Sequence, residues 1–366
     1  MNKEELIRKL RAGEDVNLEV RRDEWGYAPL TWVKDRINLT DVDLSGVDFS
    51  NKRISYVDFS GSKLNNAKFN NCDIRTCKFD KCIIEHASFD GAIIDNVVMD
   101  DVTAGDLTFK NAEIRGIKIT RGFIYKINFS DIAKIKDATF IMENTEMYKC
   151  DFSKIEAKIL INSSIIKKCS FENTVFIYES TRDGDSNNFT SSFIESTSFS
   201  GAKFEYYNIF TNSIIKDTIF TNVEFDDIGI ARALFKDNDM SNINILGDSR
   251  FINCTLVDVV LEKATGSLVF YDSIITNCNI TRTKLDKLKM TYLDVDKSNF
   301  DYSNIDSWYM ETTTLTLCGM NNMSIKSLIT KPKTTEFLIS NNDTSNYTWA
   351  TQQGVTVTRG IDDFAD

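Results

Sequence analysis

Eight cysteines and a single histidine carry the most reactive side chains in this 366-residue sequence. Zinc sites built from cysteine favour close pairs with two to four residues between the ligands. Cys72, Cys77 and Cys82 are at the upper limit of that spacing, and the other cysteines lie further apart. His86 has no second histidine to work with, so Ser-His-Asp, Cys-His and multi-His metal chemistry are nearly excluded. The cysteines are Cys72, Cys77, Cys82, Cys150, Cys169, Cys254, Cys278 and Cys318.

Large apolar residues recur every five positions over a long part of the chain. From Leu39 to Phe129 in steps of five, only Ala104 is not large and apolar. A helix repeats its apolar face every 3.6 residues and a strand every 2, so neither explains this pattern. A second period of twenty aligns Phe49, Phe69, Phe89, Phe109 and Phe129. Residue i is therefore expected to stack on residue i+20, in a solenoid with four five-residue faces per coil.

The quintets GVDFS, YVDFS, NAKFN and GAKFE resemble the A-(D/N)-L-x-x pattern of the pentapeptide-repeat family, over about residues 37–330. The resemblance implies an all-β fold, a right-handed quadrilateral β-helix (a β-solenoid). With coils about 4.8 Å apart, about 14 to 15 coils would extend roughly 70 Å. The pattern continues in shifted registers, among them one from Phe189 to Ile214 and one from Phe270 to Ile325. Each shift predicts an inserted or deleted residue at a corner.

The two ends differ from the repeats and predict small caps, because an open solenoid end exposes unpaired backbone. Residues 1–36 hold an amphipathic helix candidate around Leu6, Ile7 and Leu10, followed by the aromatic segment WGYAPLTW. The repeats then occupy residues 37–330. Residues 331–366, which begin beside Pro332, are predicted to form a C-terminal cap or tail.

The position of the cysteines within the repeat predicts a structural role. Each lies two residues before a repeat centre, in an inward slot that Ala, Val, Ser or Thr fills elsewhere. Free cysteine behaves as a small buried hydrophobe, so all eight are predicted to be reduced, buried and metal-free. His86 follows the centre Ile84 by two residues, in an outward slot, and is predicted to be a solvated surface residue.

Acidic residues follow five consecutive repeat centres and form what we call the acidic belt: Asp80, Glu85, Asp90, Asp95 and Asp100. These outward positions encircle slightly more than one coil. One interpretation is a surface that a basic partner grips. The other is a set of ion pairs between coils, Asp90 with Lys110 and Asp95 with Arg115, worth about 0–1 kcal/mol each. Asp80 beside Asp100 is not explained by the second interpretation, and both stay open.

The segment STRDGDSNN, from Ser180 to Asn188, interrupts the repeats and predicts a projecting loop. Loops on rigid scaffolds often carry recognition. In quinolone-resistance members of the family such loops matter for binding DNA gyrase, although no loop residue here matches theirs. A calcium site is not expected, since the sixth-position glycine and the distant glutamate are missing. The candidate contacts are Thr181, Arg182, Asp183, Gly184, Asp185 and Ser186.

Composition narrows the class of function. The net charge of −11 argues against direct binding of nucleic acid, because phosphate contacts need an excess of Lys and Arg. No apolar run approaches the roughly 18 residues of a membrane span, and the charged N-terminus lacks a signal-peptide core. We therefore expect a cytoplasmic protein that does not contact membranes.

No phosphate loop, carboxylate pair or nucleophile motif is present, so we expect no cofactor and no enzymatic activity. The sequence favours a protein-interaction rod that binds a macromolecular partner and inhibits or scaffolds it. One alternative is a DNA-mimic antagonist of a DNA-handling enzyme such as gyrase. Duplex DNA carries one charge per about 1.7 Å, far more than this chain. A secreted bacterial effector is a further alternative. The oligomeric state is left open, including an end-to-end dimer.

Overall fold

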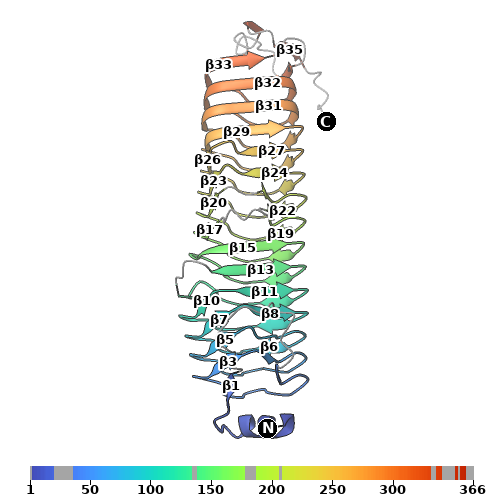
Figure 1. The fold of residues 1–366 in the computed structure, drawn as a ribbon. Coiled ribbons are helices and arrows are strands. Elements are labelled where there is room, and N and C mark those ends of the chain that lie inside the picture. The colour runs from blue at the N-terminus through green and yellow to red at the C-terminus, as the bar shows by residue number, and fades with distance from the viewer. Residues whose placement is uncertain are drawn as a thin grey trace, which may run out of the picture. The chain divides into compact units, whose positions relative to one another are not determined.

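The computed structural model describes residues 2–19, 36–133, 138–177, 187–205, 208–330, 335–339, 351–352 and 355–359. The chain divides into two compact units, Met1–Ile177 and Tyr178–Asp366. Within each unit, short parallel strands stack one above another (Figure 1), as a β-solenoid of about 14 turns in all. The predicted fold class is therefore confirmed.

The first unit begins with a helix and continues in strands. Its elements are α1 (Lys3–Arg11), β1 (Leu18–Glu19), β2 (Ile37–Asn38), β3 (Arg53–Ser55), β4 (Val57–Asp58), β5 (Asp73–Arg75), β6 (Ile83–Glu85), β7 (Ile93–Asp95), β8 (Val97–Asp100), β9 (Thr103–Gly105), β10 (Glu113–Ile114), β11 (Ile117–Thr120), β12 (Phe123–Tyr125), β13 (Thr139–Glu143), β14 (Glu146–Tyr148), β15 (Glu156–Asn162), β16 (Ile165–Lys167) and β17 (Val175–Phe176).

The second unit is built in the same way, and its last strands are longer. Its elements are β18 (Asn187–Asn188), β19 (Phe193–Glu195), β20 (Lys203–Glu205), β21 (Asn208–Ile209), β22 (Ile214–Lys216), β23 (Glu224–Asp226), β24 (Gly229–Ala231), β25 (Leu234–Lys236), β26 (Asn244–Leu246), β27 (Arg250–Ile252), β28 (Thr255–Val257), β29 (Thr265–Tyr271), β30 (Ile274–Thr276), β31 (Lys284–Asp296), β32 (Asn304–Thr316), β33 (Ser324–Thr330), β34 (Thr335–Ile339) and β35 (Thr356–Arg359).

The core of the first unit is a stack of like residues, as the period of twenty predicts. Phe49, Phe69, Phe89, Phe109 and Phe129 are buried. Successive ring centroids lie 4.8, 4.8, 5.2 and 5.1 Å apart, with nearly parallel planes. Parallel pairing in register sets this spacing, for example Ile54 with Ile74. The interior is therefore filled by the repeat's own side chains.

The inward slot two residues before each centre also makes hydrogen bonds. Cys72 Sγ donates to the carbonyl of Phe49, 2.9 Å away, and Ser62 Oγ donates to that of Leu39 at 2.6 Å. Thr174 Oγ1 makes the equivalent bond to the carbonyl of Phe152 at 2.7 Å. A small side chain with a donor satisfies a buried backbone oxygen that would otherwise be costly. Cysteine, serine and threonine share this slot for that reason.

The corners explain why the outward positions are rich in Asn, Asp and Gly. A residue two positions after a centre repeatedly has a left-handed backbone, as at Asn51 (φ 63°), Asn71 (φ 56°) and Gly91 (φ 69°). Glycine adopts this conformation without steric cost, and Asn and Asp tolerate it better than other side chains. The chain therefore turns at regular five-residue intervals.

One predicted register is wrong at its last step. Ile214 was expected to point inward, but its side chain is 46% exposed and Ile215 is buried instead. The coil is 21 residues long here, because Ile194 pairs with Ile215. Ile209 and Phe210 are both buried, and Phe210 has φ 55°. The extra residue is thus accommodated at a corner, as shifts in register predict.

The N-terminal segment packs on the first coil. Asn2 caps α1 by accepting the Glu5 amide at 2.8 Å, and Leu6 and Leu10 are buried. Arg11 Nη2 donates to the carbonyl of Asp43 at 2.7 Å. Strand β1 pairs in parallel with β3, although the five-residue period gave no sign of it. WGYAPLTW lies outside the described residues. In the C-terminal segment, β34 pairs with β32 and β35.

Candidate interaction surface on the first unit

The four sides of a coil carry different outward side chains, and we number them from the chain direction. Face 1 contains β6, β9, β12, β14 and β16. Face 2 contains the stacked Phe centres and is joined by isolated bridges such as Ser88 with Thr108. Face 3 contains β3, β5, β7 and β10, and face 4 contains β8, β11 and β13.

The acidic belt is divided among all four faces. Glu85 lies on face 1, Asp90 on face 2 and Asp95 on face 3, while Asp80 and Asp100 lie on face 4, one coil apart. The Asp100 amide donates to Asp80 Oδ1 at 3.0 Å. A flat partner that contacts one face therefore meets one or two of the five carboxylates.

Most carboxylates of the acidic belt have partners within the fold. Asp90 Oδ1 accepts the Lys110 backbone amide at 2.8 Å, and Asp100 Oδ2 pairs with Arg121. Asp80 lies 3.9 Å from Lys78 Nζ, and burial raises its pKa above the ordinary value.

The structure forms neither predicted ion pair between coils. Lys110 contacts Asp90 through its backbone amide rather than through its amine. Arg115 Nε donates to Glu113 in its own coil, 2.7 Å away, and not to Asp95. Most of the belt's hydrogen bonds therefore stabilise the stacking of coils.

Glu85 is held by a tyrosine from two coils further along. Tyr125 Oη donates to Glu85 Oε1 at 2.6 Å. The register aligns Glu85 with Gly105 and Gly105 with Tyr125, so the ring must cross Gly105. It lies so close that a Cβ on Gly105 would be 2.1 Å from Tyr125 Cζ. Gly105 occupies an outward position and is nevertheless buried. The hydrogen bond raises the pKa of Tyr125 to about 12.

Face 1 carries large apolar side chains where the repeat normally has small or polar ones. Phe123 is 42% exposed and Ile165 is 39% exposed. The Phe123 and Tyr125 rings have centroids 5.4 Å apart, and Tyr148 follows on the next coil. We call Phe123, Tyr125, Tyr148 and Ile165 the aromatic face. Sequence reasoning missed it, although large residues on both sides of a repeat centre, as in FIY at 123–125, were a readable signal.

Lysines line the corner next to the aromatic face. Lys126, Lys149 and Lys168 follow β12, β14 and β16, and all three have a left-handed backbone. We call them the lysine ridge. Lys149 Nζ lies 5.2 Å and Lys168 Nζ 5.7 Å from the centroid of the Tyr148 ring. Lys126 Nζ lies 3.6 Å from Asp106, which also lies 3.8 Å from His86 Nδ1. His86 is exposed at the same corner, as predicted.

The other residues singled out in the sequence are those of the predicted loop and the eight cysteines. Thr181, Arg182, Asp183, Gly184, Asp185 and Ser186 lie outside the described residues. All eight cysteines are buried and none forms a disulfide. Burial raises the pKa of Cys72 and Cys278 to about 11 and of Cys77, Cys82 and Cys318 to about 12. Thiols of this kind are poor nucleophiles and poor metal ligands at neutral pH.

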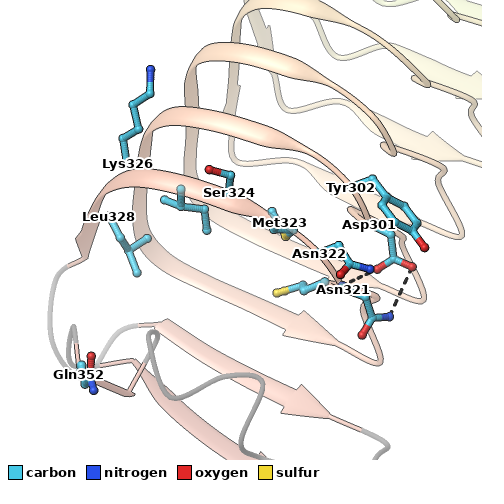
Figure 2. Close-up of a pocket in the computed structure, with 11 residues that line it drawn as sticks. Asp301, Tyr302, Asn321, Asn322, Met323, Ser324, Lys326, Leu328 and Gln352 are labelled. Atoms are coloured by element: carbon cyan, nitrogen blue, oxygen red, sulfur yellow. Dashed lines mark hydrogen bonds between the residues drawn. The ribbon is translucent and has the colours of Figure 1, made fainter.

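A cavity of about 830 Å³ lies beside the last coils of the second unit, where no cleft was expected. Figure 2 shows Asn321 reaching Asp301 across neighbouring coils. The Asn321 backbone amide donates to Asp301 Oδ1 at 2.5 Å. Lys326, which also lines the cavity, pairs with Asp306 at 2.7 Å. The charged groups of the cavity are therefore engaged in the fold and form no nucleophile-base pair.

Comparison with protein families identifies the repeat. A family model of pentapeptide repeats matches in eight copies, with matches at residues 35–71 and 58–96. The repeats of this chain are pentapeptide repeats. No curated protein matches its sequence significantly.

Solved structures similar to this chain include HetL and QnrB1. HetL, a pentapeptide repeat protein involved in heterocyst differentiation regulation from the cyanobacterium Nostoc sp. strain PCC 7120, is 13% identical. The match covers 76% of this chain and 96% of HetL, with a TM-score of 0.28. Full-length QnrB1, a plasmid-mediated fluoroquinolone resistance protein, is 14% identical over 52% of this chain and 91% of QnrB1, with a TM-score of 0.32. Likeness at this level identifies no partner.

In the described part of the chain, the side chains of the aromatic face and the lysine ridge lie at the surface. Among the described residues, no three His, Cys, Asp or Glu side chains gather as a metal site would require. No helix in the described part of the chain has the length and apolar character needed to cross a bilayer. The arrangement on face 1 can offer ring surfaces, hydrogen bonds and ammonium groups to a second macromolecule.

Proposed function

We propose that this chain is a non-enzymatic protein-interaction module that binds a macromolecular partner and inhibits or scaffolds it. The observation that carries the proposal is the aromatic face. Phe123 and Ile165 are exposed on strands whose backbones are held by parallel pairing with neighbouring coils. Aromatic side chains on a preorganised surface lose little entropy on binding and are frequent hot spots of interfaces.

The aromatic face is our first candidate for the contact. The acidic belt and the segment 181–186 remain proposed contacts as well. The belt presents one or two carboxylates per face, so a partner that used all five would have to wrap around a coil. A partner that uses face 1 meets aromatic rings, one aliphatic side chain and lysines on one side.

A pull-down with the full chain tests the proposal. Phe123→Ser together with Tyr148→Ser should release a partner that the wild type retains. Ile214→Ser is the matched control, since this residue is 46% exposed and is not part of the aromatic face. Equal retention by the Phe123→Ser/Tyr148→Ser variant and the wild type would exclude the aromatic face. No specific partner for the wild type would contradict the function itself.

A second candidate is a DNA-mimic antagonist of a DNA-handling enzyme such as gyrase. It is supported by the net charge of −11 and by Asp80 and Asp100, which lie one coil apart on face 4. Inhibition of gyrase supercoiling at low stoichiometry, lost on Asp80→Lys with Asp100→Lys and weakened by salt, would support it. A gyrase whose activity the wild type does not change would exclude the DNA-mimic candidate.

The free buried thiols support a cytoplasmic location, where disulfides are rare.

A further inference from the structure

We propose that the lysine ridge and the aromatic face together bind an acidic protein segment that also carries apolar side chains. This inference rests on the proposed protein-interaction function and adds the chemistry of the partner. The partner inferred here is acidic, whereas a partner bound by the acidic belt would be basic.

The lysine ridge concentrates positive charge on an otherwise acidic protein. Lys149 and Lys168 occupy the same corner of consecutive coils, since the Lys149 amide donates to the carbonyl of Lys167 at 3.0 Å. Neighbouring strands are about 4.8 Å apart, so the two side chains leave the backbone side by side and their like charges repel. Among the described residues no carboxylate pairs with either, and both share the Tyr148 ring. A carboxylate from a partner would relieve the repulsion.

Apolar surface lies beside the lysine ridge. Phe123 and Ile165 expose 42% and 39% of their surface. Among the outward side chains of β12, β14 and β16, the only carboxylate is Glu146. A segment that places carboxylates on the ridge therefore brings its neighbouring residues over rings and an aliphatic side chain, where burial of apolar surface stabilises the complex.

The lysine ridge fits a short acidic protein segment better than it fits nucleic acid. Binding a duplex requires many phosphate contacts along a groove, and this chain, with a net charge of −11 over its whole length, would repel the DNA backbone beyond the ridge. A short acidic segment experiences mainly the ridge, because charges further than a Debye length of about 8 Å are screened at physiological salt.

Fluorescence anisotropy with the full chain tests the proposal. The probes are a random copolymer of glutamate and tyrosine, poly-L-glutamate and a 20-base-pair DNA duplex. The copolymer should bind more tightly than poly-L-glutamate, and Lys149→Glu with Lys168→Glu should weaken copolymer binding at least tenfold. The matched control is Lys81→Glu with Lys154→Glu, corner lysines with the same left-handed backbone (φ 56° and 62°) at other corners. Its affinity should change less than twofold.

Three results would overturn the inference: no binding of the copolymer, equal loss in the control, or tighter binding of the duplex, which would indicate a nucleic-acid site. Thermal melting by circular dichroism checks that both variants fold. If a protein partner of the wild type is retained equally by the Lys149→Glu/Lys168→Glu variant, this inference fails while the proposed function stands. If the wild type retains no partner at all, the proposed function fails, and the inference fails with it.

Discussion

Replacing Gly105 with alanine should displace the Tyr125 ring from its position over face 1. The added Cβ would lie 2.1, 2.4 and 2.5 Å from three atoms of that ring, well below any real van der Waals contact. Nothing in the Gly105 backbone prevents alanine, because its φ is not in the left-handed region. Tyr125 must therefore move, and its 2.6 Å hydrogen bond to Glu85 must break.

The effect on stability should be small, because two terms oppose each other. Losing this part-buried hydrogen bond to a charged group costs about 1.5 kcal/mol. Alanine in a strand regains about 0.5–1 kcal/mol relative to glycine. The pKa of Tyr125 is the better reporter. It is raised to about 12 by the bond to Glu85, and it should fall towards the ordinary value of about 10.

Ultraviolet titration of tyrosine ionisation measures this change, and the Tyr125→Phe difference isolates one transition among the twelve tyrosines. Glu85→Gln should also lower the pKa, because it removes the charge. Gly116→Ala is the control, with its nearest atom at 3.4 Å. Because the folded pKa is raised, the stabilisation by Tyr125 is complete below about pH 10 and lost as pH rises through about 12. Identical titrations of Gly105→Ala and wild type would refute the geometry.

Three further predictions concern the core. Phe89→Ala should lower the free energy of unfolding by about 3–5 kcal/mol, since its ring lies 4.8 and 5.2 Å from its two neighbours; denaturant titration measures this. Ellman's reagent at pH 8 should find few thiols until the protein is denatured, and rapid labelling of native protein would contradict the burial. Ser62→Ala should cost about 1–3 kcal/mol, because Ser62 Oγ serves both the Leu39 carbonyl and the Val42 amide, whereas Cys72→Ser should cost less.

The fold was readable from the sequence because burial repeats at fixed intervals. Phe49, Phe69 and Phe89 are identical because each packs on the next, so the period of twenty is a direct record of contacts. The failure at Ile214 has the same origin. Ile214 and Ile215 are both large and apolar, and the choice between them depends on the extra residue at the Phe210 corner, which hydrophobicity alone does not locate.

The surface was less readable, because its contacts extend beyond adjacent coils. The period of twenty residues per coil correctly predicted that Asp80 lies beside Asp100. It did not connect Glu85 with Tyr125, which are forty residues apart and meet only because Gly105 between them has no side chain. Sequence reasoning also weighed acidic residues by their number, whereas the structure shows most belt carboxylates engaged in hydrogen bonds or ion pairs. Among the described residues no carboxylate pairs with Lys149 or Lys168.

The lysine ridge itself predicts a conflict between stability and binding. A parallel stack in register favours identical apolar residues and disfavours identical charges. For a separation of about 6 Å, the repulsion of two ammonium groups in water is about 0.7 kcal/mol. Lys149→Glu replaces this repulsion with attraction of the same size and loses a cation–π contact worth about 0.5–1 kcal/mol. The free energy of unfolding should therefore rise by about 0.5 kcal/mol while binding of the glutamate-tyrosine copolymer weakens. If Lys149→Glu instead loses more than about 1 kcal/mol in denaturant titration, the lysine stabilises the fold and needs no partner to explain it.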